Sequence, residues 1–160
     1  MTPEAVARTG MYFEEFSVGD EFTTQGRTIT DVEVTMWAMF TGDMHPMHVD
    51  NEFARDFGIF GGRFPPGLMA VAIASGLNER MGLWSGTGLA MTKQTAEYKT
   101  PVLIGDTISV RLTVLECTPR PKRNAGIVLF GYQIVRQNGD VCVQGEWTIV
   151  LASRSELDGT

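Results

Sequence analysis

The sequence predicts an α+β fold in which one buried helix is followed by a series of antiparallel strands. From Gly67 to Leu77 nearly every residue is apolar, and the apolar residues occupy the whole circumference of a helix. Residues 107–114 alternate apolar and polar side chains, as a half-buried strand does. Asn138-Gly139 lies between two further strand-like stretches and predicts a type I′ hairpin, whose two central residues need positive φ. We therefore expect this helix to be wrapped on most sides.

Shorter elements are expected before the buried helix. A Thr-rich strand is predicted from about Glu21 to Ile29, and Thr30-Asp31 offers an N-cap for a helix over Val32–Phe40. A short helix over Asn51–Phe57 then leads into a Gly-rich loop that ends at Pro65-Pro66. In the first helix, helical spacing predicts one buried face, made of Val32, Met36, Met39 and Phe40. The later strands are predicted at Leu89–Lys99, Ala125–Arg136 and Val141–Leu151.

Length and charge limit the classes of protein that fit. A chain of 160 residues predicts one domain over 1–160, and its net charge of −6 argues against nucleic acid and membrane surfaces as partners. No stretch reaches the ~18 apolar residues of a membrane-spanning helix, and Met1–Gly10 lacks an apolar signal core. We therefore expect a cytoplasmic protein. Cys117 and Cys142 have no metal-binding spacing, so two reduced thiols and no metal are expected.

The most informative short segment is Phe40–Asp50, which places Asp43 and His48 beside a glycine and a proline. Pro46 cannot continue a preceding helix, so we expect an irregular, rigid turn here. A carboxylate and an imidazole that reach the same water form a sufficient general acid/base unit for adding or removing that water. The alternative is that Asp43 caps the next helix and His48 is an ordinary, partly buried histidine.

The same segment resembles the hydratase motif of the MaoC-like, (R)-specific enoyl-CoA hydratases. That motif runs aromatic, then Gly-Asp-x-Asn-Pro-hydrophobic-His, with a small residue six positions later. The chain departs from the family at His45, which stands in place of asparagine, and at Pro66, which stands in place of histidine. The similarity covers roughly residues 12–152, the expected domain core. The matching residues are Phe40, Gly42, Asp43, Pro46, Met47, His48, Ala54, Gly67, Ser75-Gly76-Leu77 and the stretch Pro101–Asp106.

The resemblance implies a hotdog fold, in which a curled antiparallel sheet wraps a long central helix, and it implies roles for individual residues. Asp43 and His48 would bind the water and move the proton at C2 of an acyl thioester. Gly67 would offer a backbone N–H to the thioester oxygen, and Ser75 would orient the pair. Close packing remains the alternative for Gly67, and a hydroxyl satisfied by a carbonyl one turn back remains the alternative for Ser75.

Two further interpretations stay open. His45 either selects the acyl chain or is a structural substitute donor in place of the asparagine. The basic run Arg120, Lys122 and Arg123 either meets the phosphates of coenzyme A or is a solvated hairpin tip.

The sequence therefore predicts an enoyl-CoA hydratase or 3-hydroxyacyl-CoA dehydratase, with coenzyme A or an acyl carrier protein carrying the substrate and no further cofactor. The alternatives are a hotdog acyl-CoA thioesterase and a non-catalytic acyl-thioester-binding subunit. A single curled sheet leaves its edges unpaired, so we also expect a homodimer or a dimer of dimers.

Overall fold

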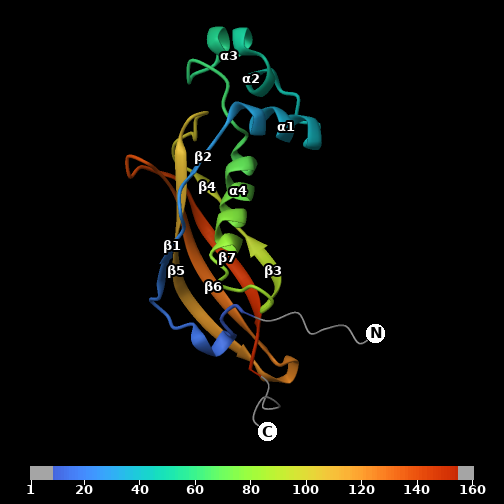
Figure 1. Cartoon of the computed structure of the whole chain (residues 1–160), viewed down its shortest axis with the longest axis vertical. Helices are drawn as coiled ribbons and strands as arrows, with labels where there is room; N and C mark the ends of the chain where they lie inside the picture. Colours follow the sequence, from blue (N-terminus) through green and yellow to red (C-terminus); the bar gives the residue numbers. More distant parts are fainter. Residues whose placement is uncertain (1–8, 155–160) are drawn as a thin grey trace.

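One curled antiparallel sheet and one long helix make up most of the computed structural model, which describes residues 9–154 (Figure 1). The predicted α+β hotdog layout is confirmed; the ends of the expected domain, 1–8 and 155–160, lie outside the described residues. The helices are α1 (Asp31–Thr41), α2 (Pro46–Val49), α3 (Asn51–Phe57) and α4 (Gly67–Arg80), with 3-10 turns η1 (Phe13–Glu15) and η2 (Pro121–Arg123). The strands are β1 (Glu21–Thr23), β2 (Arg27–Thr28), β3 (Gly88–Gln94), β4 (Glu97–Tyr98), β5 (Thr107–Arg120), β6 (Ala125–Arg136) and β7 (Val141–Ala152).

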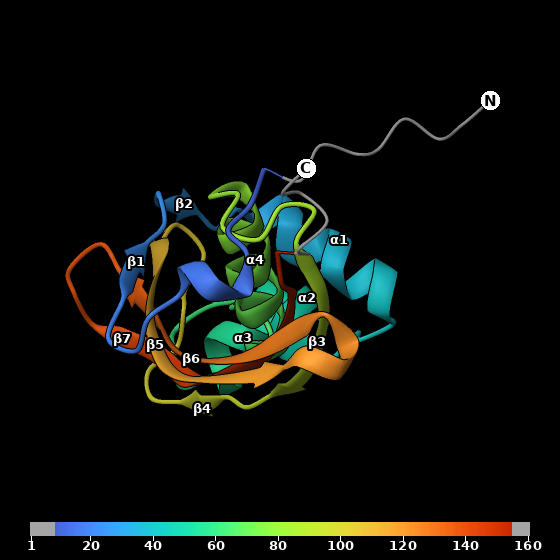
Figure 2. The same ribbon diagram turned by 90° about the horizontal axis from the view of Figure 1, so that it is seen from below.

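The strand order is β1-β5-β6-β7-β3, and every pairing is antiparallel. β2 also pairs with β5, and β4 also pairs with β7. The long strands β5, β6 and β7 form the middle of the sheet, and α4 lies inside its curl (Figure 2).

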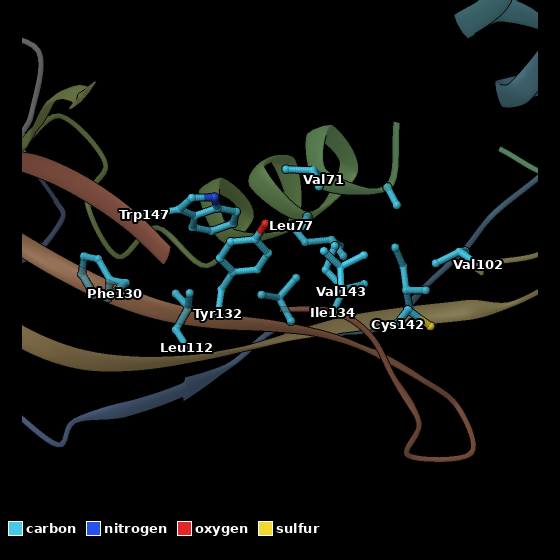
Figure 3. Packing of buried hydrophobic residues seen from close by; sticks show 14 of the residues in the cluster. Val71, Leu77, Val102, Leu112, Phe130, Tyr132, Ile134, Cys142, Val143 and Trp147 are labelled. Atoms are coloured by element: carbon cyan, nitrogen blue, oxygen red, sulfur yellow. The ribbon is translucent and has the colours of Figure 1, made fainter. Parts of the chain in front are cut away.

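The core lies between α4 and the inner face of the sheet (Figure 3). Phe130, Tyr132 and Trp147 are buried there, and the last two rings stack with centroids 4.4 Å apart. The Tyr132 hydroxyl donates a 2.9 Å hydrogen bond to the Thr95 carbonyl, which satisfies its polar end. The alternation in β5 is confirmed, because every second residue from Ile108 to Val114 is buried.

Only one side of α4 is covered within the chain, so the expectation of a helix wrapped on most sides is wrong for a single copy. Apolar residues on one side, such as Met69 and Leu77, pack on the sheet. The other side is exposed and carries Leu68, Ala72, Ser75, Gly76 and Glu79.

The predicted buried face of α1 is also wrong. Val34 and Ala38 are the buried residues of this helix. The residues predicted to be inside are exposed: Val32 by 65%, Met36 by 63%, Met39 by 71% and Phe40 by 89%. The helix has apolar residues on more than one side, and periodicity alone does not identify the side that packs against its own chain.

Two predicted strands are each divided by a threonine. The Thr24 hydroxyl accepts the hydrogen bond of the Val110 N–H, and the Thr95 hydroxyl accepts that of the Glu146 N–H. In both places a side chain takes the part of a backbone carbonyl, which interrupts the ladder. The expected strand over 21–29 therefore becomes β1 and β2, and the one over 89–99 becomes β3 and β4.

The β6–β7 connection differs from the predicted type I′ turn. Gly139 has a φ of +91°, whereas Asn138 is not among the described residues with positive φ. The Gly139 N–H donates to the Arg136 carbonyl at 2.9 Å, and the Asn138 side-chain Oδ1 accepts from the Asp140 N–H. Residues 137–140 separate β6 from β7, so the loop is longer than the two residues of a type I′ hairpin.

Candidate active site

A mostly apolar cavity of about 830 Å³ lies where the segment containing α1, α2 and α3 meets the start of α4. Asp43, His45, His48 and Gly67 all line it, together with Trp37 and Tyr98. The structure therefore brings together four of the residues predicted for the site.

Asp43 directly follows the end of α1. Gly42 ends the helix in the left-handed region at φ 76°, and its N–H donates to the Ala38 carbonyl. The Asp43 N–H donates to the Thr41 hydroxyl at 3.2 Å, and among residues 9–154 its carboxylate accepts no hydrogen bond. The alternative that Asp43 caps the next helix is wrong, because His45 is the N-cap of α2.

His48 lies in a one-turn helix rather than in the irregular turn expected from Pro46. Proline is favoured at the first position of a helix, where its missing N–H costs nothing, and Pro46 starts α2 in this way. The His48 Nδ1 lies 2.7 Å from the Phe64 carbonyl oxygen. Because a carbonyl only accepts, Nδ1 carries the proton, and the neutral ring keeps a free lone pair on Nε2. This is the tautomer that a general base needs.

His45 has the opposite tautomer. Its Nδ1 accepts a hydrogen bond from the Met47 N–H at 3.2 Å and thereby caps α2, so its neutral ring carries the proton on Nε2. The two imidazole rings lie 5.9 Å apart between centroids. The structural contact of His45 therefore uses the ring as an acceptor, not as the donor expected, and the residue also lines the cavity.

Gly67 starts α4 with a free backbone donor. Its N–H has no acceptor within residues 9–154, and it lies at the positive end of the helix dipole. It is also closely packed, since a Cβ at this position would lie 2.5 Å from Cε1 of Tyr98. The packing and the free N–H expected as alternatives for Gly67 are therefore both present.

The remaining predicted residues lie elsewhere in the chain. Ser75 is exposed on the uncovered side of α4, about 12 Å along the helix from Gly67 at 1.5 Å per residue, and does not line the cavity. Arg120, Lys122 and Arg123 are exposed at the β5–β6 hairpin tip. This tip lies at the opposite end of the molecule from α2 and α3 (Figure 1).

Sequence reasoning missed three contributors to the site. The Phe64 carbonyl fixes the His48 tautomer, the Tyr98 ring packs on Gly67, and Lys99 brings a positive charge to the cavity wall. Lys99 hydrogen-bonds to Glu97, and this bond, with a second one from Gln144, holds the pKa of Glu97 below its ordinary value. No motif in the sequence marks these residues, because each acts through a contact that only the fold creates.

Other chemical features are few. No group of three or more His, Cys, Asp or Glu side chains in the described part of the chain is arranged to hold a metal ion. Cys117 and Cys142 are free thiols, and burial raises the pKa of both. Within residues 9–154 no helix is long and apolar enough to cross a membrane.

Comparisons with known proteins agree on the family. The chain is 28% identical over 144 residues to an (R)-specific enoyl-CoA hydratase from Rhodospirillum rubrum, covering 89% of this chain and 93% of that protein. It is 32% identical to a 3-hydroxybutyryl-CoA dehydratase from Methylorubrum extorquens, covering 71% of this chain and 69% of that protein. The crystal structure of a MaoC-like dehydratase from Rhodospirillum rubrum superposes with a TM-score of 0.81 at 27% identity, covering 91% of this chain and 99% of that one. Residues 14–131 match the MaoC like domain family, and the chain belongs to that family.

Proposed function

We propose that the protein is a hydratase or dehydratase that adds water to, or removes it from, the C2–C3 bond of an acyl thioester, with Asp43 and His48 as the acid/base pair. One observation carries the proposal: both side chains line the same apolar cavity, and His48 is in the tautomer that leaves Nε2 free. The names of the relatives support the same reaction class.

The elimination needs two proton transfers. A base removes the weakly acidic proton at C2, and an acid delivers a proton to the hydroxyl that leaves C3. Hydration runs the same steps in reverse, with the water held between Asp43 and His48. In a single copy Asp43 is exposed and His48 is half-buried, so the chain by itself does not shield the pair from bulk water.

Negative charge gathers on the thioester oxygen as the enolate forms. We propose that the Gly67 N–H stabilises it, because this donor has no acceptor among the described residues and lies at a helix N-terminus. Coenzyme A or an acyl carrier protein would carry the substrate, and no metal or redox cofactor is part of the scheme.

We further propose a homodimer, or a dimer of dimers. The exposed apolar residues of α1, the uncovered side of α4 and the wholly exposed edge strand β3 are surfaces that a second copy would cover. The proposed roles of Ser75 as an orienting residue, and of Arg120, Lys122 and Arg123 as phosphate contacts, both depend on this assembly, since none of these residues lines the cavity of its own chain. A cytoplasmic location also stays a prediction.

The direct test is a spectrophotometric hydration assay against short, medium and branched enoyl-CoA thioesters. Asp43→Asn and His48→Ala should each lower kcat by roughly 10²-fold or more with little effect on folding. Near-normal hydration by either variant contradicts the mechanism. A thiol reagent in a parallel assay detects free coenzyme A, which a thioesterase would release, and binding without turnover would identify a non-catalytic subunit.

Removing metal ions tests the cofactor proposal separately. Activity should survive extensive treatment with EDTA. If chelation abolished it and a divalent ion restored it, the acid/base scheme would be wrong.

A further inference from the structure

One arginine, Arg63, binds to α1, α2 and α3 beside the proposed site. Arg63 lies in the loop between α3 and α4, and its guanidinium contacts the α1–α3 segment (residues 31–57) at three places. Its Nε donates to the Asn51 side chain at 2.7 Å, its Nη1 donates to the His48 carbonyl at 3.2 Å, and its Nη2 forms an ion pair with Asp31. Asp31 starts α1, Asn51 starts α3 and His48 belongs to α2.

Arginine suits this position for a geometric reason. Its planar guanidinium presents donors on three nitrogens in a fixed fork, so three separate acceptors are held at set angles to one another. The Arg63 side chain is only 11% exposed, whereas that of its ionic partner Asp31 is 56% exposed. The Asn51 side chain and the His48 carbonyl, both neutral acceptors, therefore help to stabilise the mostly buried Arg63 guanidinium.

Few fully buried side chains fix the geometry of the α1–α3 segment within one chain. Its buried residues are Val34, Ala38 and Ala54, none of them large. α2 contributes no buried residue. Segments with few buried apolar contacts open more readily, so polar bonds account for a larger share of their order.

Arg63 and its neighbour hold His48 from two directions. Arg63 binds the backbone carbonyl of His48, and the carbonyl of Phe64 accepts from the imidazole Nδ1. The Phe64 ring also packs edge-on against the imidazole at 5.1 Å. We propose that Arg63 is a positioning residue, which fixes α2 relative to α1 and thereby sets the place and tautomer of His48 relative to Asp43. The effect of Arg63 on kcat rests on the proposed function. Its effect on the tautomer of His48 rests on the geometry alone.

The test compares Arg63→Gln and Arg63→Lys with the full-length protein by two readouts. The first is nitrogen-15 NMR of the imidazoles in the free protein, in which only His45 and His48 contribute signals. The second is the separate measurement of kcat and KM for enoyl-CoA hydration. Arg63→Gln should convert the single Nδ1–H tautomer of His48 into a mixture and lower kcat on the order of 10- to 10²-fold, with KM changed by less than about 3-fold. Arg63→Lys should behave similarly, because one ammonium cannot hold three acceptors at these angles.

Two controls separate positioning from charge. Asp31→Asn removes the charge of the ion pair but keeps an acceptor oxygen, and should retain kcat within about 3-fold. Arg55→Gln removes an exposed arginine of α3 that pairs with Glu52 and Asp56, and should match the wild type in both readouts. If Arg63→Gln shows no thermal unfolding transition, Arg63→Lys and Asn51→Ala replace it.

Two results overturn the proposal: an unchanged His48 tautomer in folded Arg63→Gln or Arg63→Lys protein, or a wild-type kcat in Arg63→Lys. A proposed function that failed would show differently, as a wild-type protein without hydration activity or as fully active Asp43→Asn and His48→Ala variants. The tautomer measurement would still decide whether Arg63 positions His48.

Discussion

Replacing Gly67 by alanine tests whether the first turn of α4 must lie where it does for catalysis. The new Cβ would lie 2.5 Å from Cε1 of Tyr98 and 3.0 Å from Cδ1 and Cζ. Carbon atoms normally approach to about 3.5–4.0 Å, so the ring or the helix start must move by about 1 Å. A displacement of about 1 Å in a positioned group costs on the order of 10²-fold in rate. We expect Gly67→Ala to lower kcat by about 10- to 10²-fold.

The assay is steady-state hydration of a short enoyl-CoA, followed by loss of the conjugated thioester absorbance. Tyr98→Ala removes the ring that the new Cβ would meet, so it serves as the matched second variant. Adding Gly67→Ala to Tyr98→Ala should lower kcat by less than about 3-fold, because the two changes act on one contact and are not additive.

Two results would refute this reasoning. A folded Gly67→Ala protein with wild-type kcat would show that the position of the Gly67 N–H does not matter. A double variant that loses as much activity relative to Tyr98→Ala as Gly67→Ala loses relative to the wild type would show that the ring contact is not the cause.

Three further predictions concern the α1–α3 segment. His45→Asn should cap α2 as well as histidine does and keep kcat within about 3-fold. His45→Ala should lose the cap, which costs about 1 kcal/mol of stability. A changed order of acyl-chain preference in His45→Asn would instead favour the substrate-selecting interpretation. Partial burial alone would raise the pKa of Glu33, but hydrogen bonds from Thr30 and the charge of Arg27 lower it below its ordinary value. The stabilisation from Glu33 is therefore present above the pKa of the unfolded state and is lost as the pH falls through the lower pKa of the folded state. Glu33→Gln should therefore lower Tm at pH 7 and match the wild type near pH 2, and a pH-independent difference in melting curves would contradict this. Phe40→Glu should raise the dissociation constant of the proposed dimer by more than about tenfold in sedimentation equilibrium, because about 2 kcal/mol of apolar burial is lost. An unchanged mass would place α1 outside the interface.

Much of the fold was predictable because its signals are local. The apolar stretch that becomes α4, the alternation of β5 and the bounds of α3 and β6 follow from periodicity and from glycine and proline positions. The two divided strands were not predictable in this way. A threonine hydroxyl that replaces a backbone acceptor has the same sequence signature as any threonine in a strand.

The proposed pair was found because a motif resemblance fixes residues close together in sequence. Asp43 and His48 lie on one short segment, and the structure places both on one cavity. Arg63, Phe64 and Tyr98 act through contacts between distant segments, and no spacing rule links them to the pair. Their roles needed the fold.

The expectations that are wrong for a single chain have one physical cause in common. The apolar pattern of α1, the apolar circumference of α4 and the predicted closeness of Ser75 to the pair all assume that these surfaces are covered, and one copy leaves them exposed. An apolar pattern records that a surface is buried in the working protein, but it does not say which chain covers it. A second copy is the cover that we propose. It follows that Phe40→Glu should lower kcat together with the assembled mass. If a monomeric variant stayed fully active, the exposed surfaces would have no part in forming the site.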